Sequence, residues 1–284
     1  MKFQKRDKDG FVIGEGKFNI SQQQRKDILE ITNLDIVSAI DYFDKFYTIP
    51  LSRHINLTNA RLLDCACGKG WFSLSAYFAG CREIVSVDIS QEELNKFKEI
   101  TKILGITGRI KIILGDITHL PFRDRYFDIV ASLETIEHIP QNKGVNELLR
   151  VLNNIFIVET INAFFPIDTH DTIYPLVHFL PVFIRRKINQ AYGSGEPSGY
   201  ISILKLERLL KNFRLLTPFK VFNNVEEWKH CFPVNNPYQG NRPINGDSKK
   251  WKLRYYYYRT LFNLLGGNSR FAFDKIHGIY QRLK

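Results

Sequence analysis

From Arg61 to Glu159 the sequence alternates between short apolar runs and longer segments of helical periodicity, and this alternation limits the possible fold most strongly. The expected strands are Arg61–Ala66, Glu83–Asp88, Ile110–Leu114, Phe127–Leu133 and Asn154–Glu159. The expected helices run from about Gly70 to Phe78, from the capping residue Ser90 to about Leu104, and up to about Leu152. Such βαβ units predict an α/β fold with a doubly wound, mostly parallel sheet.

Three regions are expected around the strands. Residues 1–55 should form an N-terminal segment with a helical cap at Leu34–Phe46, and residues 56–223 the core, with an aromatic insertion at 162–200 after the fifth strand. Within the core, Ser202–Phe213 predicts a helix and Arg214–Phe222 a late strand. Residues 224–284 should form a basic, aromatic C-terminal extension, because Trp251, Tyr255, Tyr258, Phe262 and Leu265 fall at helical spacing.

The composition excludes some classes of protein. With 44% hydrophobic residues the 284-residue chain is not globally disordered. Its most apolar stretch, Tyr174–Ile184, is too short to span a bilayer, and the charged start lacks the apolar core of a signal peptide. Cysteines without C-x-x-C spacing favour reduced thiols, so we expect a soluble, cytoplasmic protein. The net charge of +11 favours phosphates, nucleic acid or an anionic membrane surface as partners, or is only a solvated basic surface.

The stretch LLDCACGKGWFS, Leu62 to Ser73, has the form of a ligand-binding turn. Asp64 ends the first expected strand, Gly68 and Gly70 allow the backbone to approach a ligand closely, and Asp88 ends the second strand. The dinucleotide fingerprint G-x-G-x-x-G lacks its third glycine here, and Trp71 would crowd a pyrophosphate. A cofactor without a phosphate fits better, and Asp64 suits a cationic group on it.

With these motifs in register, Arg61–Phe222 resembles the class I S-adenosylmethionine-dependent methyltransferases of the type 11-like group. LLDCACGKGWFS is similar to their first motif, and Asp88 in VSVDIS to their ribose-binding acid. Asp116 in ILGDITHLPF is similar to the acid near the adenine amino group, and YFDIVASLETIEHI and ELLRVLNNIFIVETIN to later strands. The chain departs from the family at Ala66, which stands for its first glycine, and at Lys69.

The resemblance implies a Rossmann-like sheet of the seven-stranded type and S-adenosylmethionine as cofactor. The cofactor-binding residues that it implies are Asp64, Ala66, Gly68, Gly70, Asp88, Ile89, Asp116, Ile117 and Leu133.

The segment ETIEH offers candidate catalytic residues beyond the fourth strand. If Glu134 begins a helical turn, Glu137 and His138 lie at i+3 and i+4 on its own face. ETIEH resembles the E-x-x-E-H motif of small-RNA 2′-O-methyltransferases and ubiquinone-pathway O-methyltransferases. That resemblance implies that Glu134, Glu137 and His138 bind a divalent cation such as Mg²⁺. His170 or His178 in the insertion would supply a further ligand and complete this metal site. A metal-free base at His138, or a structural role for it, stays open.

Several functions are compatible with these residues. The preferred prediction is O-methylation of a hydroxyl on a small-molecule, glycan or lipid-linked acceptor, with peripheral contact to an anionic membrane through the apolar and cationic segment Phe179–Lys187. An RNA methyltransferase is the alternative, favoured by the net positive charge and by the E-x-x-E-H resemblance. The basic aromatic run KKWKLRYYYYRTLF could stack bases, lie at a lipid headgroup layer or pack on the domain. A NAD-dependent oxidoreductase and a non-catalytic cofactor-binding scaffold fit less well. The sequence leaves the acceptor and the oligomeric state open.

Overall fold

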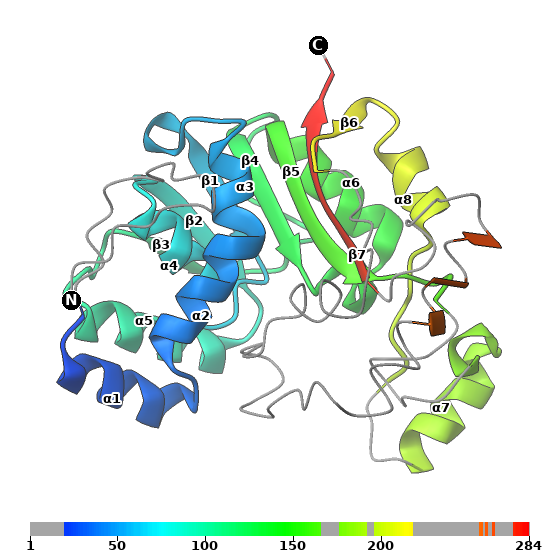
Figure 1. The fold of residues 1–284 in the computed structure, drawn as a ribbon, viewed down its shortest axis with the longest axis horizontal. Helices are drawn as coiled ribbons and strands as arrows, with labels where there is room; N and C mark the ends of the chain where they lie inside the picture. The colour runs from blue at the N-terminus through cyan, green and yellow to red at the C-terminus, as the bar shows by residue number, and fades with distance from the viewer. Residues whose placement is uncertain are drawn as a thin grey trace.

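A seven-stranded sheet with the strand order β3-β2-β1-β4-β5-β7-β6 forms the centre of the protein (Figure 1). The structure, a computed structural model, describes residues 20–165, 176–191, 196–217, 256–257, 259–260, 263–264 and 275–283. The strands are β1 (Arg61–Cys65), β2 (Glu83–Asp88), β3 (Lys111–Leu114), β4 (Phe127–Leu133), β5 (Leu152–Ile161), β6 (Phe213–Leu215) and β7 (Lys275–Arg282). Strands β1 to β5 are parallel, and β7 runs antiparallel to both β5 and β6.

Helices cover both faces of this sheet (Figure 1). The α-helices are α1 (Gln22–Thr32), α2 (Ile36–Phe43), α3 (Ile49–Ser52), α4 (Trp71–Phe78), α5 (Gln91–Ile103), α6 (Gln141–Val151), α7 (Val182–Ala191) and α8 (Ile203–Leu209). A π-helix, η1 (Asp44–Thr48), joins α2 to α3, and 3-10 turns lie at η2 (Leu57–Asn59), η3 (Ile136–His138) and η4 (Val177–Phe179). No helix among the described residues is long and apolar enough to cross a membrane.

Each face of the sheet has its own apolar core. Side chains of α1 to α5 and η1 pack on the face that carries Leu62, Ile129 and Ile157. Side chains of α6 and α8 pack on the opposite face, which carries Leu63 and Val130. Because consecutive residues of a strand point to opposite faces, strands that are buried on both sides read as continuous apolar runs. The predicted α/β fold with a seven-stranded, mostly parallel sheet is confirmed.

Most of the predicted elements of the core agree with the structure. β2 and β4 have the predicted bounds, and β1 and β3 differ from them by one residue at one end. β5 is longer than expected, because α6 ends at Val151 and the buried Leu152 already pairs with Phe127 of β4. Of the predicted late strand Arg214–Phe222, the described residues 214–217 contribute only the end of β6. Residues 218–222 lie outside the described residues.

The C-terminal region contains a strand that the sequence did not predict, whereas its described residues between 256 and 264 are helical as expected. Residues Lys275–Arg282, placed by the sequence outside the core, form β7 between β5 and β6. Ile276 and Tyr280 enter one core and Ile279 the other, so this short strand shows neither helical spacing nor polar alternation. The core therefore includes β7, while Trp251, Tyr255, Tyr258, Phe262 and Leu265 lie outside the described residues.

Two arginines of the insertion after β5, Arg185 and Arg186, form contacts within the protein. Arg185 of α7 is 7% exposed, and its guanidinium donates to the Ser198 carbonyl at 2.6 Å and lies over the Tyr200 ring. Arg186 forms an ion pair with Glu196 at 3.0 Å. Arg185 is therefore an internal anchor of the segment 196–200, and it does not present its charge on the surface of the predicted membrane-contacting segment Phe179–Lys187.

The start of α4 gives a direct test of this packing. Gly70, the N-cap residue of α4, has φ 75°, and an added Cβ would lie 2.1 Å from Cζ of Phe97. Gly70→Ala should lower the free energy of unfolding by about 1–2 kcal/mol for the left-handed backbone and by about 1–3 kcal/mol more for overpacking. Gly105→Ala is the matched control, because Gly105 has φ 68° and no atom within 4 Å of its added Cβ. Equal losses in urea unfolding of the two variants would contradict the packing of Phe97 on Gly70.

Candidate cofactor site

A cleft of about 490 Å³ lies at the carboxyl ends of β1 and β4, where ligands bind in open α/β sheets. It is lined by Thr32, Asn33, Leu34, Ala66, Cys67, Gly68, Lys69, Trp71, Glu93, Leu133 and Glu134. Ala66, Gly68 and Leu133 are among the predicted cofactor contacts, and Glu134 is among the predicted catalytic residues. The cleft thus joins the turn after β1 to the end of β4.

The turn after β1 is built from left-handed residues. Ala66, Gly68 and Gly70 have φ of 55°, 50° and 75°. Glycine adopts this region freely, whereas alanine is disfavoured there by about 1–2 kcal/mol. The turn therefore keeps its left-handed conformation at Ala66, although the family's first glycine is absent.

Asp88 at the end of β2 joins this turn to the start of α5. Its Oδ2 accepts the Gly68 N–H at 2.7 Å, and its Oδ1 accepts the Ser90 N–H at 2.8 Å. A carboxylate has about four lone-pair sites, so Asp88 can still accept the hydroxyls of a ribose. The neighbouring Ile89 is 77% exposed, which leaves an apolar surface beside Asp88 for a ligand to cover.

The sequence S-Q-E-E from Ser90 to Glu93 has the pattern of a capping box, but at the start of α5 only half of this box is formed. The Ser90 hydroxyl accepts the Glu93 N–H at 3.3 Å, but the Ser90 N–H is bonded to Asp88. The Glu93 carboxylate instead lies 3.8 Å from the Lys69 ammonium and 3.2 Å from that of Lys96. The charge of Lys69, a departure from the family pattern, is therefore balanced within the cleft.

Asp64 lies behind the turn and is 3% exposed. The Ser73 hydroxyl donates to its Oδ2 at 2.6 Å, so the Ser86 hydroxyl, 2.7 Å from Ser73 Oγ, must donate to Ser73. Burial raises the pKa of Asp64 to about 6, against the lowering effect of the hydrogen bonds from Ser73. Asp64 does not line the cleft. It influences a ligand there through the electrostatic field of its carboxylate and through its position behind the turn.

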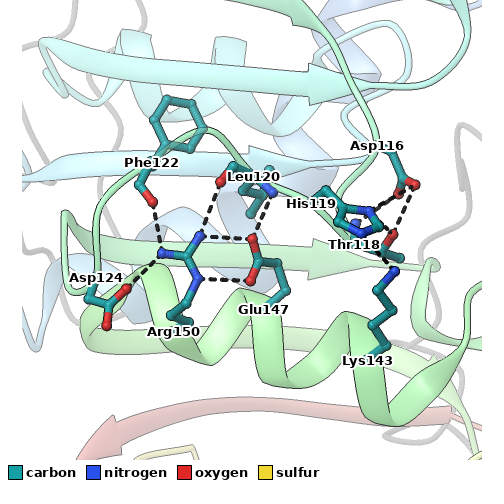
Figure 2. Close-up of polar contacts among 9 residues, drawn as sticks. All are labelled: Asp116, Thr118, His119, Leu120, Phe122, Asp124, Lys143, Glu147 and Arg150. Atoms are coloured by element: carbon teal, nitrogen blue, oxygen red, sulfur yellow. Dashed lines mark hydrogen bonds and ion pairs between the residues drawn. The ribbon is translucent and has the colours of Figure 1, made fainter.

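The loop between β3 and β4, which carries Asp116, is fixed by α6 (Figure 2). The Arg150 guanidinium donates to the carbonyls of Leu120 and Phe122 at 3.0 and 2.8 Å and pairs with Glu147 and Asp124. Glu147 in turn accepts the Leu120 N–H at 2.7 Å. The guanidinium of Arg150 holds the pKa of Glu147 below its usual value, so this charged clamp persists at neutral pH.

The predicted adenine contacts Asp116 and Ile117 lie in the loop after β3. The Asp116 carboxylate accepts the N–H and the hydroxyl of Thr118, both at 2.8 Å, and lies 3.7 Å from His119 Nδ1 (Figure 2). Lys143 donates to Nε2 of the same imidazole at 2.8 Å. Ile117 is 5% exposed and packs in the core, and neither residue lines the cleft.

ETIEH does not form the predicted helical turn. Glu134 has φ 53°, and this left-handed residue ends β4 before the 3-10 turn η3 begins. Glu134 lines the cleft, whereas the buried Glu137 accepts the Thr160 hydroxyl at 2.8 Å and His138 is exposed. Among the residues that the structure describes, no three His, Cys, Asp or Glu side chains are grouped to hold a metal ion.

The predicted metal set Glu134, Glu137 and His138 is therefore not assembled, because the left-handed Glu134 breaks the shared face. Of the two histidines expected to complete it, His178 contacts the rings of Phe179 and Tyr200, and His170 lies outside the described residues.

The N-terminal cap adds residues to the cleft that no sequence motif indicated. Thr32, Asn33 and Leu34 connect α1 to α2 and form one side of it. Asn33 ends α1 with φ 56°, and its N–H donates to the Leu29 carbonyl at 2.8 Å. The predicted amphipathic helix at Leu34–Phe46 was the signal that the cap reaches the site.

The geometry of the turn, Asp88 and the parallel strands is that of a class of enzymes with a common fold. Residues 63–155 match the family model described as a methyltransferase domain, so this part of the chain is a methyltransferase domain. A solved S-adenosylmethionine-dependent methyltransferase from Mesorhizobium loti is similar in fold, with a TM-score of 0.54 and 13% identity over 86% of this chain and all of that one. The PH0226 protein from Pyrococcus horikoshii has a TM-score of 0.51 and 23% identity over 72% of this chain and 95% of that one.

Curated relatives match part of the chain. A sterol 24-C-methyltransferase from Eremothecium gossypii is 31% identical over 126 residues, which are 39% of this chain and 34% of that protein. A norajmaline N-methyltransferase from Rauvolfia serpentina is 32% identical over 94 residues, 32% of this chain and 31% of that protein. The chain thus spans about a third of the length of these relatives.

The buried Asp64 predicts a pH dependence of stability. The pKa of its carboxyl is raised to about 6 from 3.8, so the unfolded chain ionises first as pH rises. This group therefore lowers the free energy of unfolding between about pH 4 and 6, and the full cost, up to about 3 kcal/mol, is present above pH 7. Urea unfolding should show Asp64→Asn gaining stability relative to the parent protein as pH rises from 4.5 to 7.5. A constant difference would contradict the raised pKa.

Proposed function

We propose that this protein transfers the methyl group of S-adenosylmethionine to a hydroxyl of a small-molecule acceptor. The observation that carries the proposal is the Asp88 carboxylate, which lies directly behind the cleft lining and accepts the N–H groups of the lining residue Gly68 and of Ser90. This arrangement offers oxygen acceptors for ribose hydroxyls beside a turn that a ligand can approach closely. The match to a methyltransferase domain over residues 63–155 supports the same cofactor.

A pyrophosphate-containing cofactor fits this cleft less well. Trp71 lines the cleft at the start of α4, where a pyrophosphate would need the helix N-terminus. Glu134 adds a carboxylate to the lining, and Asp64 lies behind the turn. These acids favour a ligand that carries positive charge, such as the ammonium and sulfonium groups of S-adenosylmethionine.

In this proposal the bound cofactor supplies an electrophilic methyl group, and the protein holds the cofactor and the acceptor in the geometry that methyl transfer requires. Methyl transfer requires the nucleophile, the methyl carbon and the sulfur to be collinear, so most of the catalytic effect comes from fixed geometry. Asp88 would hold the ribose, and Leu133 would form an apolar contact. Glu134 is the predicted catalytic residue that lines the cleft. His138 is a candidate base, and Glu137 fixes the loop through Thr160.

The acceptor in this proposal has a substantial apolar part. The curated relatives include proteins named as sterol and norajmaline methyltransferases, whose names give apolar or polycyclic acceptors. The insertion after β5 exposes Phe179, Val182 and Phe183, at 56%, 56% and 65%. These side chains support an apolar or lipid-linked acceptor, and they would also allow peripheral contact with a membrane.

Ligand-dependent stability separates this proposal from a nicotinamide-dependent oxidoreductase. S-adenosylhomocysteine at a hundred times its Kd should stabilise the folded protein by about 2.7 kcal/mol, whereas NAD should leave the melting temperature unchanged. Thermal unfolding with each ligand measures the difference. Stabilisation by NAD without stabilisation by S-adenosylhomocysteine would contradict the proposal.

The role of Asp88 can be tested with the same ligand. Asp88→Asn should weaken S-adenosylhomocysteine binding by about 1.5–3 kcal/mol, because a hydrogen bond to a charged acceptor is lost. Asp41→Asn is the control, since Asp41 is an exposed carboxylate on α2. Isothermal titration should give the control the affinity of the parent protein. An unchanged affinity in Asp88→Asn would show that the ribose binds elsewhere.

A further inference from the structure

A polar cluster of two buried residues and one partly buried residue lies one strand beyond the cofactor cleft, and no pattern in the sequence indicates it. It consists of Tyr47 from η1, Glu159 from β5 and His277 from β7, and we call it the acceptor wall. Tyr47 is 1% exposed and Glu159 is 6% exposed. The three residues come from distant parts of the chain and meet through the sheet and the N-terminal cap.

The sheet register places Glu159 beside the cleft. Leu133, which lines the cleft, is paired with Glu159, and Glu159 is paired with His277. Neighbouring strands lie about 4.8 Å apart, so Glu159 is one strand spacing from the lining. The Glu134 N–H also donates to the Glu159 carbonyl at 2.8 Å, which fixes the end of β4 against β5.

The side chains of the acceptor wall share the face of the sheet that the cap covers. Ile157 and Ile279 pack in the core under the cap, and Glu159 and His277 are each two residues away on the same strands. The Tyr47 hydroxyl donates to Glu159 Oε2, and its ring meets the His277 ring edge to face with centroids 5.0 Å apart. Tyr47 therefore fixes the direction of the Glu159 carboxylate.

The π-helix η1 holds Tyr47 in place. Ser75 of α4 donates to Asp44 Oδ1 at 2.5 Å, and Thr48 Oγ1 lies 2.5 Å from Ser75 Oγ. Because Ser75 has one hydroxyl proton, Thr48 must be the donor to Ser75. Anchors on both sides of Tyr47 thus tie the π-helix to α4, and π-helical turns are frequent at functional sites.

We infer that Glu159 is the carboxylate that faces the reacting group of the acceptor, that Tyr47 is its positioning residue, and that the acceptor is therefore one with a hydroxyl proton to donate. This assignment rests on the proposed function. In the reaction the acceptor oxygen forms a bond to the methyl carbon, and the C–S bond breaks with its electron pair going to sulfur. The hydroxyl proton passes to Glu159. The acceptor wall supplies this group on the covered side of the sheet, whereas His138 lies exposed beyond β4.

Two cofactor analogues test the assignment without knowledge of the acceptor. Sinefungin carries an amine in the position of the transferred methyl group, and S-adenosylhomocysteine has no group there. A carboxylate that faces this position should favour the amine, so the ratio of the two Kd values reports on Glu159. The parent protein at pH 7.5 should bind sinefungin at least about tenfold more tightly than S-adenosylhomocysteine.

Glu159→Gln should reduce this preference by about tenfold or more and leave the Kd of S-adenosylhomocysteine within about twofold. Tyr47→Phe keeps the carboxylate but removes its orienting donor, so it should reduce the preference by a smaller factor. Glu99→Gln removes an exposed carboxylate of α5 and should keep the parent ratio. Circular dichroism checks the fold of each variant, and Tyr47→Phe carries the test if Glu159→Gln does not fold.

Three outcomes would overturn the assignment. The first is an unchanged ratio in the folded Glu159→Gln or, if that variant does not fold, in Tyr47→Phe. The second is a loss of preference in His138→Ala but not in Glu159→Gln, which would place the facing group at His138. If the parent protein binds neither analogue, the proposed function fails, and the assignment of Glu159 fails with it.

Discussion

The Asp88 carboxylate accepts hydrogen bonds from two backbone N–H groups, and these bonds connect the elements around the cleft. Gly68 lies in the turn after β1 and Ser90 is the cap of α5, so Asp88 fixes the turn and the helix relative to β2. Because the Ser90 N–H is used in this way, Glu93 is released from the capping box and can balance Lys69 in the cleft. The shape of the turn and the charge of the cleft both follow from the position of this one side chain.

The features that the sequence predicted well depend on short stretches of chain. The bounds of β2 and β4, and the places of Gly68 in the turn and of Asp88 at the end of β2, follow from apolar runs and turn residues within about one βαβ unit. β7 was missed because its pattern has meaning only between β5 and β6, where both of its faces are buried. The acceptor wall was missed for the same reason, since Tyr47, Glu159 and His277 are neighbours only in the folded sheet.

ETIEH shows a different limit of prediction. Residues at i, i+3 and i+4 share a face only if the backbone is helical throughout, and the left-handed Glu134 removes that condition. The side-chain types alone carry no information on this backbone angle. Asp116 is similar, because its contact with Thr118 is local and polar, and the same residue types would also suit a ligand contact.

The position of β7 has a consequence for the order in which the molecule is completed during synthesis. β1 to β5 can pair once residue 161 has left the ribosome, but β5 then has an open edge until Lys275–Arg282 follow much later. β6 is made earlier than β7, yet in the described sheet it pairs with β7 and must wait for it. Contacts so distant in sequence form slowly, and an open apolar edge invites association with other chains. The cofactor cleft can therefore form before the acceptor wall, because His277 of the acceptor wall lies on β7. The risk of misassembly is greatest in the interval between the pairing of β1 to β5 and the addition of β7.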